Sequence, residues 1–251
     1  MIAVELKNVN KQFKGQSVPA LDNVSVQIEE GEFVTVLGSS GCGKTTLIKM
    51  LNRLYEPDSG EIYLFGKNVK EQNPVELRRK IGYVIQQIGL FPHMTVKANI
   101  ATIPKILKWD KKKIDAETDR MLRLVQLEPD EFRDRYPAQL SGGQQQRIGL
   151  ARALICDPRI MLLDEPFGAI DAINREILQN ELKAIHQKSG RTYLFVTHDI
   201  REALKLGTKV IIMHEGRILQ YDTPENIIES PANEFVENLI RTADLKGGAE
   251  H

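Results

Sequence analysis

The chain has 251 residues, of which 41% are hydrophobic, so it can build a substantial core in one large domain or two small ones. Its 34 Lys and Arg residues balance 34 Asp and Glu residues, and this balance excludes an overall attraction to nucleic acid, so we expect no nucleic acid partner. The two cysteines, Cys42 and Cys156, exclude a disulfide framework and fit a reducing compartment.

In chain order, the first third is predicted to form short strands joined by glycine turns. These strands cover 2–9, then 24–38 on both sides of Gly31, then 61–66, because apolar residues alternate along them. A helical pattern over 44–54 stops at the turn-forming cluster 56–60. The N-terminal stretch also lacks the apolar segment of a secretory signal.

The later two thirds are predicted to be mostly helical, with strands between the helices. A helical region runs from about Thr95 to Leu127 and ends near Pro129. From Gly142 onward the predicted order is a helix, a strand over 160–163, a helix over 171–189, a strand over 192–196, a helix and a strand over 209–214. This alternation predicts an α/β fold with a mostly parallel sheet, and a lobe formed by 95–155. The helix after Asp171 is expected to bury one apolar face, made of Ile173, Ile177, Leu178, Leu182 and Ile185.

Two further features bear on a possible association with a membrane. No apolar run approaches the ~18 residues that cross a bilayer, so we expect a soluble, cytoplasmic chain whose role at a membrane would need a partner chain. The densest basic run, 105–113, is followed by Asp115, Glu117 and Asp119. We interpret it as a solvated helix face, with a polar contact to a membrane partner as the alternative.

The stretch GSSGCGKTT follows the strand that ends near Leu37 and opens a helix, which is the context of a phosphate-binding loop. Glycines let successive backbone N–H groups converge on phosphate oxygens, Lys44 offers a charge to the terminal phosphates, and the Thr45 hydroxyl suits Mg²⁺. A simple glycine-rich turn is the alternative. The loop consists of Gly38, Ser39, Ser40, Gly41, Cys42, Gly43, Lys44, Thr45 and Thr46.

Three other predicted strands end in polar residues. IMLLDEP is an apolar strand that finishes in two carboxylates, of which Asp164 fits a Mg²⁺ contact and Glu165 a general base, with capping of the next turn as the alternative. His198, in FVTHDI, could contact a γ-phosphate or hold the attacking water, or be hydrogen-bonded structure. In YVIQQIG, Gln86 could reach Mg²⁺ or water, with Gln87 as the alternative.

The stretch LSGGQQQRIGLARAL, 140–154, begins a helix without any acidic residue, although Asp or Glu would suit the positive end of the helix dipole. A phosphate supplied from outside would take that place. The order of the phosphate loop, VIQQ, LSGGQQQR, LLDEP, GAID and VTHD resembles the nucleotide-binding subunits of ATP-binding cassette (ABC) transporters, over residues 2–240. Ile170 stands where the family more often has Leu.

The resemblance implies a P-loop ABC ATPase fold with a mostly parallel sheet core, an antiparallel β region and a helical lobe. It implies one nucleotide-binding domain over 1–240, with a core lobe of 1–85 and 156–240, a helical lobe of 86–155 and a tail of 241–251. ATP and Mg²⁺ are the implied cofactors. The resemblance implies that the catalytic residues are Glu165, His198 and Gln86, and that the metal contacts are Thr45, Gln86 and Asp164. Phe13 would lie against the adenine ring, with core packing as the alternative. The residues that would act on a partner's ATP are Ser141, Gly142, Gly143 and Asp171.

Such subunits work as head-to-tail pairs, so the resemblance implies a homodimer or a paired nucleotide-binding subunit at the cytoplasmic face of the membrane. Permease subunits would be bound through the surface after Gln86, whose apolar tip (Leu90, Phe91 and Met94) has core packing as its alternative. A substrate-binding protein would take part indirectly.

The substrate class is indicated only by resemblance. RRKIGYVIQQIGLFPHMTVKANI, ILKW and DEPFGAIDAINREILQ look most like importers of glycine betaine, carnitine, choline and related quaternary amines. Another importer (polyamine, amino acid or anion) and a soluble ABC ATPase acting on DNA or ribosomes are the alternatives, whereas a P-loop kinase or GTPase does not account for LSGGQQQR. Many osmoprotectant relatives continue into paired CBS modules, and no such modules follow LKGGAEH in this sequence.

Overall fold

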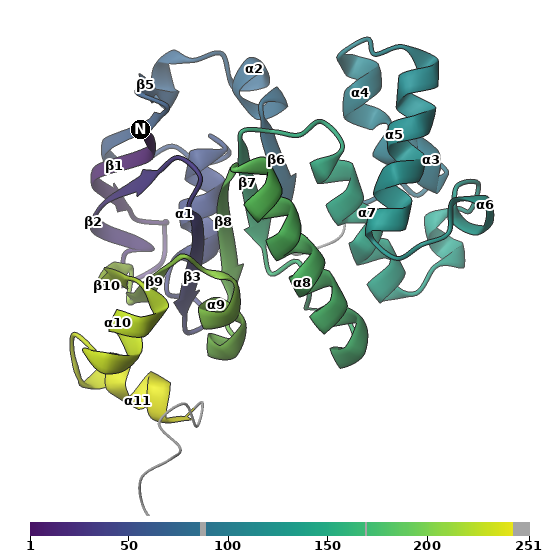
Figure 1. Ribbon diagram of the computed structural model, residues 1–251. Coiled ribbons are helices and arrows are strands. Elements are labelled where there is room, and N and C mark those ends of the chain that lie inside the picture. The colour runs from purple at the N-terminus through teal and green to yellow at the C-terminus, as the bar shows by residue number, and fades with distance from the viewer. Residues whose placement is uncertain (86–88, 169, 243–251) are drawn as a thin grey trace, which may run out of the picture. The chain divides into compact units, whose positions relative to one another are not determined.

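The structure is a computed structural model that describes residues 1–85, 89–168 and 170–242 (Figure 1). The chain forms two compact units, one made of Met1–Arg78 with Gly190–His251 and the other of Arg79–Ser189. The boundaries of these units differ from the boundaries of the two lobes that the resemblance implies, 1–85 with 156–240 and 86–155. The lobe boundaries stay a prediction. Among the described residues no helix has the length and apolar character needed to cross a membrane.

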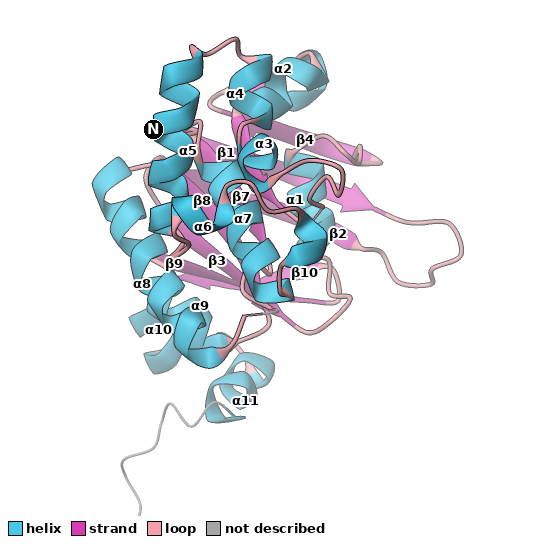
Figure 2. Cartoon of the chain, turned by 90° about the vertical axis from the view of Figure 1, so that its right-hand side faces the viewer, coloured by secondary structure: helices cyan, strands magenta, loops and turns pink. Residues whose placement is uncertain are grey.

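The first unit contains a four-stranded antiparallel sheet in the order β2-β1-β4-β5. Figure 2 labels β2, β1 and β4 of this sheet. Its strands are β1 (Ile2–Lys11), β2 (Leu21–Glu29), β4 (Ser59–Leu64) and β5 (Lys67–Asn68). β2 alternates between buried and exposed residues, which is the pattern of a strand with one face toward a core. The short helices η1 (Val69–Glu71) and α2 (Pro74–Arg79) follow this sheet.

The same unit holds parallel strands centred on β3 (Phe33–Gly38), all of whose residues are buried. β3 pairs in parallel with β8 (Thr192–Thr197) on one side and with β9 (Lys209–His214) on the other, and β10 (Arg217–Asp222) pairs antiparallel with β9. Strands buried on both faces are near-continuous apolar runs, and Phe33–Gly38 is such a run apart from Thr35, whose buried hydroxyl donates a hydrogen bond to the Ala203 carbonyl oxygen. The helix α1 (Lys44–Leu51) begins six residues after β3 ends, as the sequence predicts.

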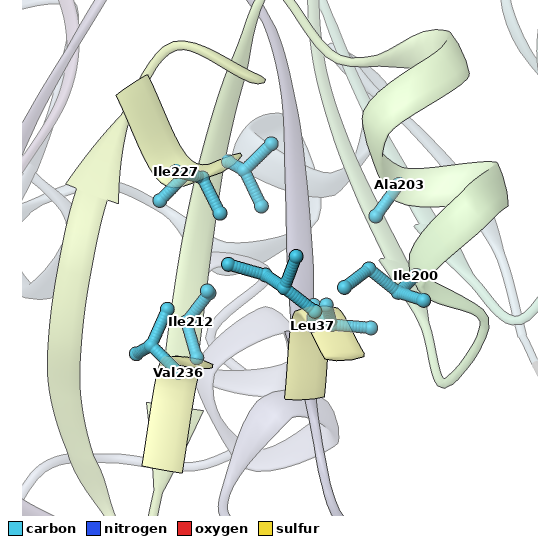
Figure 3. Packing of buried hydrophobic residues seen from close by; sticks show 8 residues of the cluster. Leu37, Ile200, Ala203, Ile212, Ile227 and Val236 are labelled. Carbon is cyan, nitrogen blue, oxygen red and sulfur yellow. The ribbon is translucent and has the colours of Figure 1, made fainter. Parts of the chain in front are cut away.

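Helices α9 (Ile200–Leu206), α10 (Pro224–Glu229) and α11 (Glu234–Thr242) bury their apolar side chains against β3 and β9. Figure 3 shows Leu37, Ile212 and Val236 within this cluster, together with side chains of α9 and α10. Leu37 directly precedes the phosphate loop, so the cluster fixes the point at which the loop leaves the sheet. The cluster consists of Leu37, Ile200, Ala203, Val210, Ile212, Ile227, Val236 and Ile240.

The second unit pairs β6 (Ile81–Val84) in parallel with β7 (Ile160–Asp164). Its helices are α3 (Val96–Ile100), α4 (Thr102–Ile106), α5 (Lys111–Leu124), α6 (Pro129–Phe132), α7 (Gly142–Leu154) and α8 (Ala172–Ser189), with the turn η2 (Pro137–Gln139) before α7. The helical region predicted over 95–127 is therefore divided into three helices. One break falls at Lys108, which has φ +57, and Asp110 then caps α5 by accepting a hydrogen bond from the Lys113 N–H.

The expected apolar face of α8 is wrong for two of its residues. Ile173 and Ile177 are 76% and 39% exposed, whereas Leu178 and Leu182 are buried and Ile185 is half-buried. Leu178 is five positions after Ile173, which is about 140° around a helix, so the two side chains lie on different faces. The fold class is confirmed: strands alternate with helices, and parallel and antiparallel pairing are both present.

Candidate functional site

The predicted phosphate loop lies between β3 and α1 and depends on its glycines. A β-carbon at Gly38 would collide with the Met213 carbonyl oxygen of β9, and one at Gly43 with the Ala20 carbonyl oxygen. Gly41 and Gly43 also have positive φ values of +79 and +107. Because L side chains rarely adopt this conformation, the loop requires glycine for its backbone path as well as for space.

Lys44 is buried within this loop. Its ammonium group donates hydrogen bonds to the carbonyl oxygens of Gly38 at 2.7 Å and Ser39 at 2.9 Å. A buried cation held by neutral carbonyls has a strong electrostatic preference for an anion, and a phosphate group would supply one. Thr45 and Thr46, in the first turn of α1, are half-buried.

Part of the loop lines a pocket of about 530 Å³, a volume in the range of small-molecule sites. It is lined by Gly15–Ala20, by Ser39–Cys42, and by His214 and Glu215. Phe13 lies outside this lining. Its half-buried ring packs edge-on against Tyr55, with the ring centroids 5.2 Å apart, and the Lys11 ammonium lies 5.6 Å from the ring centroid.

His198 comes directly after β8, at the same sheet edge as the phosphate loop, because Leu37 of β3 pairs with Thr197 of β8. The turn is fixed by Thr197, whose hydroxyl accepts a hydrogen bond from the Asp199 N–H and donates one to the buried Glu202 carboxylate at 2.5 Å. The side chain of His198 is exposed. Glu202 did not emerge from the sequence; the signal that could have indicated it is an acidic residue in the first turn of the helix after VTHD.

In the second unit, Asp164 is the last residue of β7 and is buried, and Glu165 follows it half-buried. Glu165 has a positive φ of +48. Its carbonyl oxygen accepts hydrogen bonds from the side-chain amide of Gln146 at 3.2 Å and from the Gly168 N–H at 3.3 Å. Gln86, predicted at the end of the strand in YVIQQIG, lies outside the described residues, as does its alternative Gln87.

The helix α7 begins with a capping box. The Ser141 hydroxyl accepts a hydrogen bond from the Gln144 N–H, and the Gln144 side-chain oxygen accepts one from the Ser141 N–H. Ser141 and Gly142 are exposed, and Gly143 is half-buried. The neutral side chains thus satisfy part of the helix terminus, and the exposed start of the helix remains open to a ligand.

Asp171 stands at the start of α8 in a similar arrangement. Its carboxylate accepts hydrogen bonds from the Asn174 side-chain amide at 2.7 Å and from the Asn174 N–H at 3.1 Å. These two bonds, the side-chain one first, hold the pKa of the Asp171 carboxyl below its usual value. Asp171 is therefore anionic at neutral pH.

Comparison with known proteins identifies the family. Residues 21–168 match the family model described as ABC transporter. The glycine betaine/carnitine/choline transport ATP-binding protein OpuCA of Bacillus subtilis (strain 168) is 52% identical over 237 residues, which are 94% of this chain and 62% of OpuCA. The glycine betaine uptake system ATP-binding protein YehX of Escherichia coli (strain K12) is 46% identical over 242 residues, which are 96% of this chain and 78% of YehX.

A similar solved structure is the dimer of the ATP-binding cassette MJ0796 in a post-hydrolysis state, bound to ADP and Pi. It shares 36% identity and a TM-score of 0.81, covering 88% of this chain and 98% of that one. This chain spans less than two thirds of the length of OpuCA. The chain belongs to the ATP-binding cassette (ABC) transporter family.

Proposed function

We propose that this chain is the ATP-hydrolysing subunit of an ABC importer and that ATP closes two copies of it head to tail. The observation that carries the proposal is the loop between β3 and α1, where the buried ammonium of Lys44 lies among backbone carbonyls at a helix start. A relative in which such a cassette is a dimer bound to ADP and Pi supports it.

The oxygen-rich donor set fits Mg²⁺. The Thr45 hydroxyl and the Asp164 carboxylate would hold the ion together with phosphate oxygens, and Gln86 would be a further contact. Among the described residues no group of three or more His, Cys, Asp or Glu side chains could hold a metal by itself. This fits Mg²⁺, which typically takes one or two carboxylates and completes its shell with waters and substrate phosphates. When bound, the ion neutralises charge on the phosphates.

In the hydrolytic step a water molecule attacks the γ-phosphorus of ATP, and ADP leaves. The Glu165 carboxylate takes the proton from the attacking water, and His198 contacts the γ-phosphate or holds that water. Lys44 binds the phosphates, and Phe13 would stack on the adenine. The partner's ATP would be contacted by Ser141, Gly142, Gly143 and Asp171.

The permease contact is proposed for the segment after β6. Asn99 is buried and fixes this segment, because its side chain accepts a hydrogen bond from the Phe91 N–H and donates to the carbonyls of Phe91 and Met94. Phe91 is thereby held with 39% of its surface exposed, and Leu90 and Met94 are half-buried. An exposed aromatic residue on a rigid turn suits a protein contact.

We further propose that the transported substrate is a quaternary amine such as glycine betaine, carnitine or choline, and that the chain acts at the cytoplasmic face of the membrane. The support is the naming of OpuCA and YehX. The permease and an extracytoplasmic substrate-binding protein would be the other components. Titrating the substrate-binding protein encoded beside this chain with choline and with spermidine distinguishes this class from polyamine import.

The test of the ATPase proposal uses Glu165→Gln, which keeps the size of the side chain and removes the charge. ATP hydrolysis should fall by about 10²–10⁴, because one general base is lost, while Mg²⁺–ATP still binds. Size-exclusion chromatography with light scattering should then show a dimer with Mg²⁺–ATP. Lys44→Ala is the control, since it should weaken nucleotide binding and stay monomeric. A Glu165→Gln chain that hydrolyses ATP at the wild-type rate, or stays monomeric at saturating ATP, would contradict the proposal.

A further inference from the structure

Glu165 adopts a backbone conformation that a residue with a side chain rarely adopts. Its φ of +48 places it in the left-handed region, where most non-glycine residues are disfavoured. Such conformations persist where the surrounding structure holds them, and they concentrate at functional sites. The direction of the Glu165 side chain depends on this backbone, so whatever holds the backbone also aims the carboxylate.

Gln146 is one of the groups that hold it. The residue lies in the second turn of α7 and is only 4% exposed, and its amide donates a hydrogen bond to the Glu165 carbonyl oxygen at 3.2 Å. The Gly168 N–H donates to the same oxygen at 3.3 Å from the turn that follows. One of these bonds is local, whereas the bond from Gln146 reaches across 19 residues of sequence.

The three consecutive glutamines of α7 have different partners. Gln144 closes the capping box with Ser141. Gln145 donates to the carbonyl oxygens of Pro137 and Leu140, which are both on the turn that leads into the helix. Only the bond from Gln146 goes to the acidic end of β7. Gln146 therefore differs from Gln144 and Gln145, because its side chain donates to Glu165 and not to the start of α7 or the turn before it.

We infer that Gln146 is a positioning residue for Glu165 and that it links the start of α7 to hydrolysis within the same chain. The inference rests on the proposed function. In that function the N-terminus of α7 meets the ATP of the partner chain, and Gln146 lies four residues after Gly142, on the same rigid helix. A movement of α7 on meeting ATP is then transmitted to the backbone of Glu165, so that engagement of α7 changes the aim of the chain's own base.

The test replaces Gln146 by Met, which is nearly the same size but has no N–H to donate. We expect kcat for ATP hydrolysis to fall by roughly 10- to 100-fold, because a small misplacement of a catalytic group has an effect of that order, while KM for ATP stays within about threefold. With slow hydrolysis, Mg²⁺–ATP should also accumulate the dimer in size-exclusion chromatography. Structural damage alone would lose the dimer rather than produce it.

Gln145→Met is the matched control, because it makes the same change at the next residue and removes bonds only to the preceding turn. It should keep kcat near the wild-type value and accumulate no dimer. If Gln146→Met does not fold, as judged by circular dichroism, Gln146→Asn takes its place, since its amide is one bond too short to reach Glu165, and the same loss of kcat is expected.

A wild-type kcat for the folded Gln146 variant, an equal loss in both glutamine variants, or a loss of ATP binding would overturn the inference. These outcomes are distinct from failure of the proposed function, in which the wild-type chain itself would not hydrolyse ATP.

Discussion

Two helices of this molecule are proposed to meet phosphate, and they begin in different ways. Neither α1 nor α7 has an acidic residue in its first turn. α1 starts from Gly43, which has φ +107, and within the described chain no side chain caps this terminus. α7 starts from Ser141, whose hydroxyl and backbone N–H form a capping box with Gln144.

The difference concerns charge. α1 brings a buried ammonium, Lys44, to its own start, so the chain's own loop can bind a phosphate by attraction as well as by backbone N–H groups. In its first turn α7 brings only neutral groups. Glu or Gln can close a capping box, and Gln144 closes this one without adding a negative charge. The start of α7 is therefore stable by itself and still favourable to an anion, as a site shared with a second chain requires.

The largest expected effect comes from obstructing the start of α7. Ser141→Arg, made in a Glu165→Gln chain, puts a long side chain where a phosphate would approach, and we expect the ATP-dependent dimer to disappear from size-exclusion chromatography. ATP binding by the monomer should not change, because the phosphate loop is untouched. Thr223→Arg is the control: the Thr223 hydroxyl accepts a hydrogen bond from the Asn226 N–H at the start of α10, as the Ser141 hydroxyl does from Gln144 in α7, so both variants lose a hydroxyl cap of about 1 kcal/mol. A dimer that persists in Ser141→Arg would contradict the proposal that the start of α7 meets the phosphate of a partner chain.

A subtler change tests the role of neutrality in α7. Gln144→Glu preserves the capping box and adds one negative charge at the helix start. Because a charge there is worth about 0.3–1 kcal/mol and the dimer contains two such helices, the dimer dissociation constant should rise about 3- to 30-fold. Thermal stability of the monomer should not fall, since a carboxylate suits the isolated helix. Light scattering at low and high salt measures this, and an effect independent of salt would contradict the electrostatic explanation.

The phosphate-loop side of the comparison can be sharpened at Phe13. Phe13→Ala should raise the KM for ATP about three- to tenfold if the ring stacks on adenine, and Phe13→Tyr should leave it unchanged. Tyr55→Ala is the matched control, because it removes the ring that packs edge-on against Phe13 at 5.2 Å and not the proposed stacking face. Steady-state ATPase assays give these values. An unchanged KM in Phe13→Ala, with the fold intact, would make Phe13 a packing residue.

The elements that the sequence predicts well are those with strong local signals. The loop between β3 and α1 combines an apolar run, glycines and a helical pattern, and these agree with one another. The predicted buried face of α8 was wrong for Ile173 and Ile177, because these two residues are apolar and yet lie on the exposed side of the helix. The bond from Gln146 to Glu165 joins a side chain to a backbone oxygen 19 residues away, and no periodicity of the sequence encodes such a pairing.

The smallest expected effect concerns the ionisation of Asp171. Hydrogen bonds from Asn174 lower the pKa of Asp171 in the folded chain below the unfolded value of about 3.9. The stability that this shift contributes is present above that unfolded pKa and is lost as the pH falls through the lower, folded pKa. Asn174→Ala should raise the folded pKa of Asp171 toward its usual value, as measured by NMR titration of the carboxyl carbon.

The chain offers a matched pair for this change, because the Asn226 amide donates to the Asp222 carboxylate at 2.9 Å and lowers the pKa of Asp222 in the same way. Asn226→Ala should therefore raise the pKa of Asp222 and leave dimerisation alone. If Asp171 acts on the ATP of the partner chain, Asn174→Ala alone should weaken the ATP-dependent dimer of the Glu165→Gln chain, by about twofold, because an exposed polar contact is worth little. If the two variants have equal dimer affinity, the role of Asp171 is limited to capping the start of α8. The shared ATP site would then depend on the start of α7.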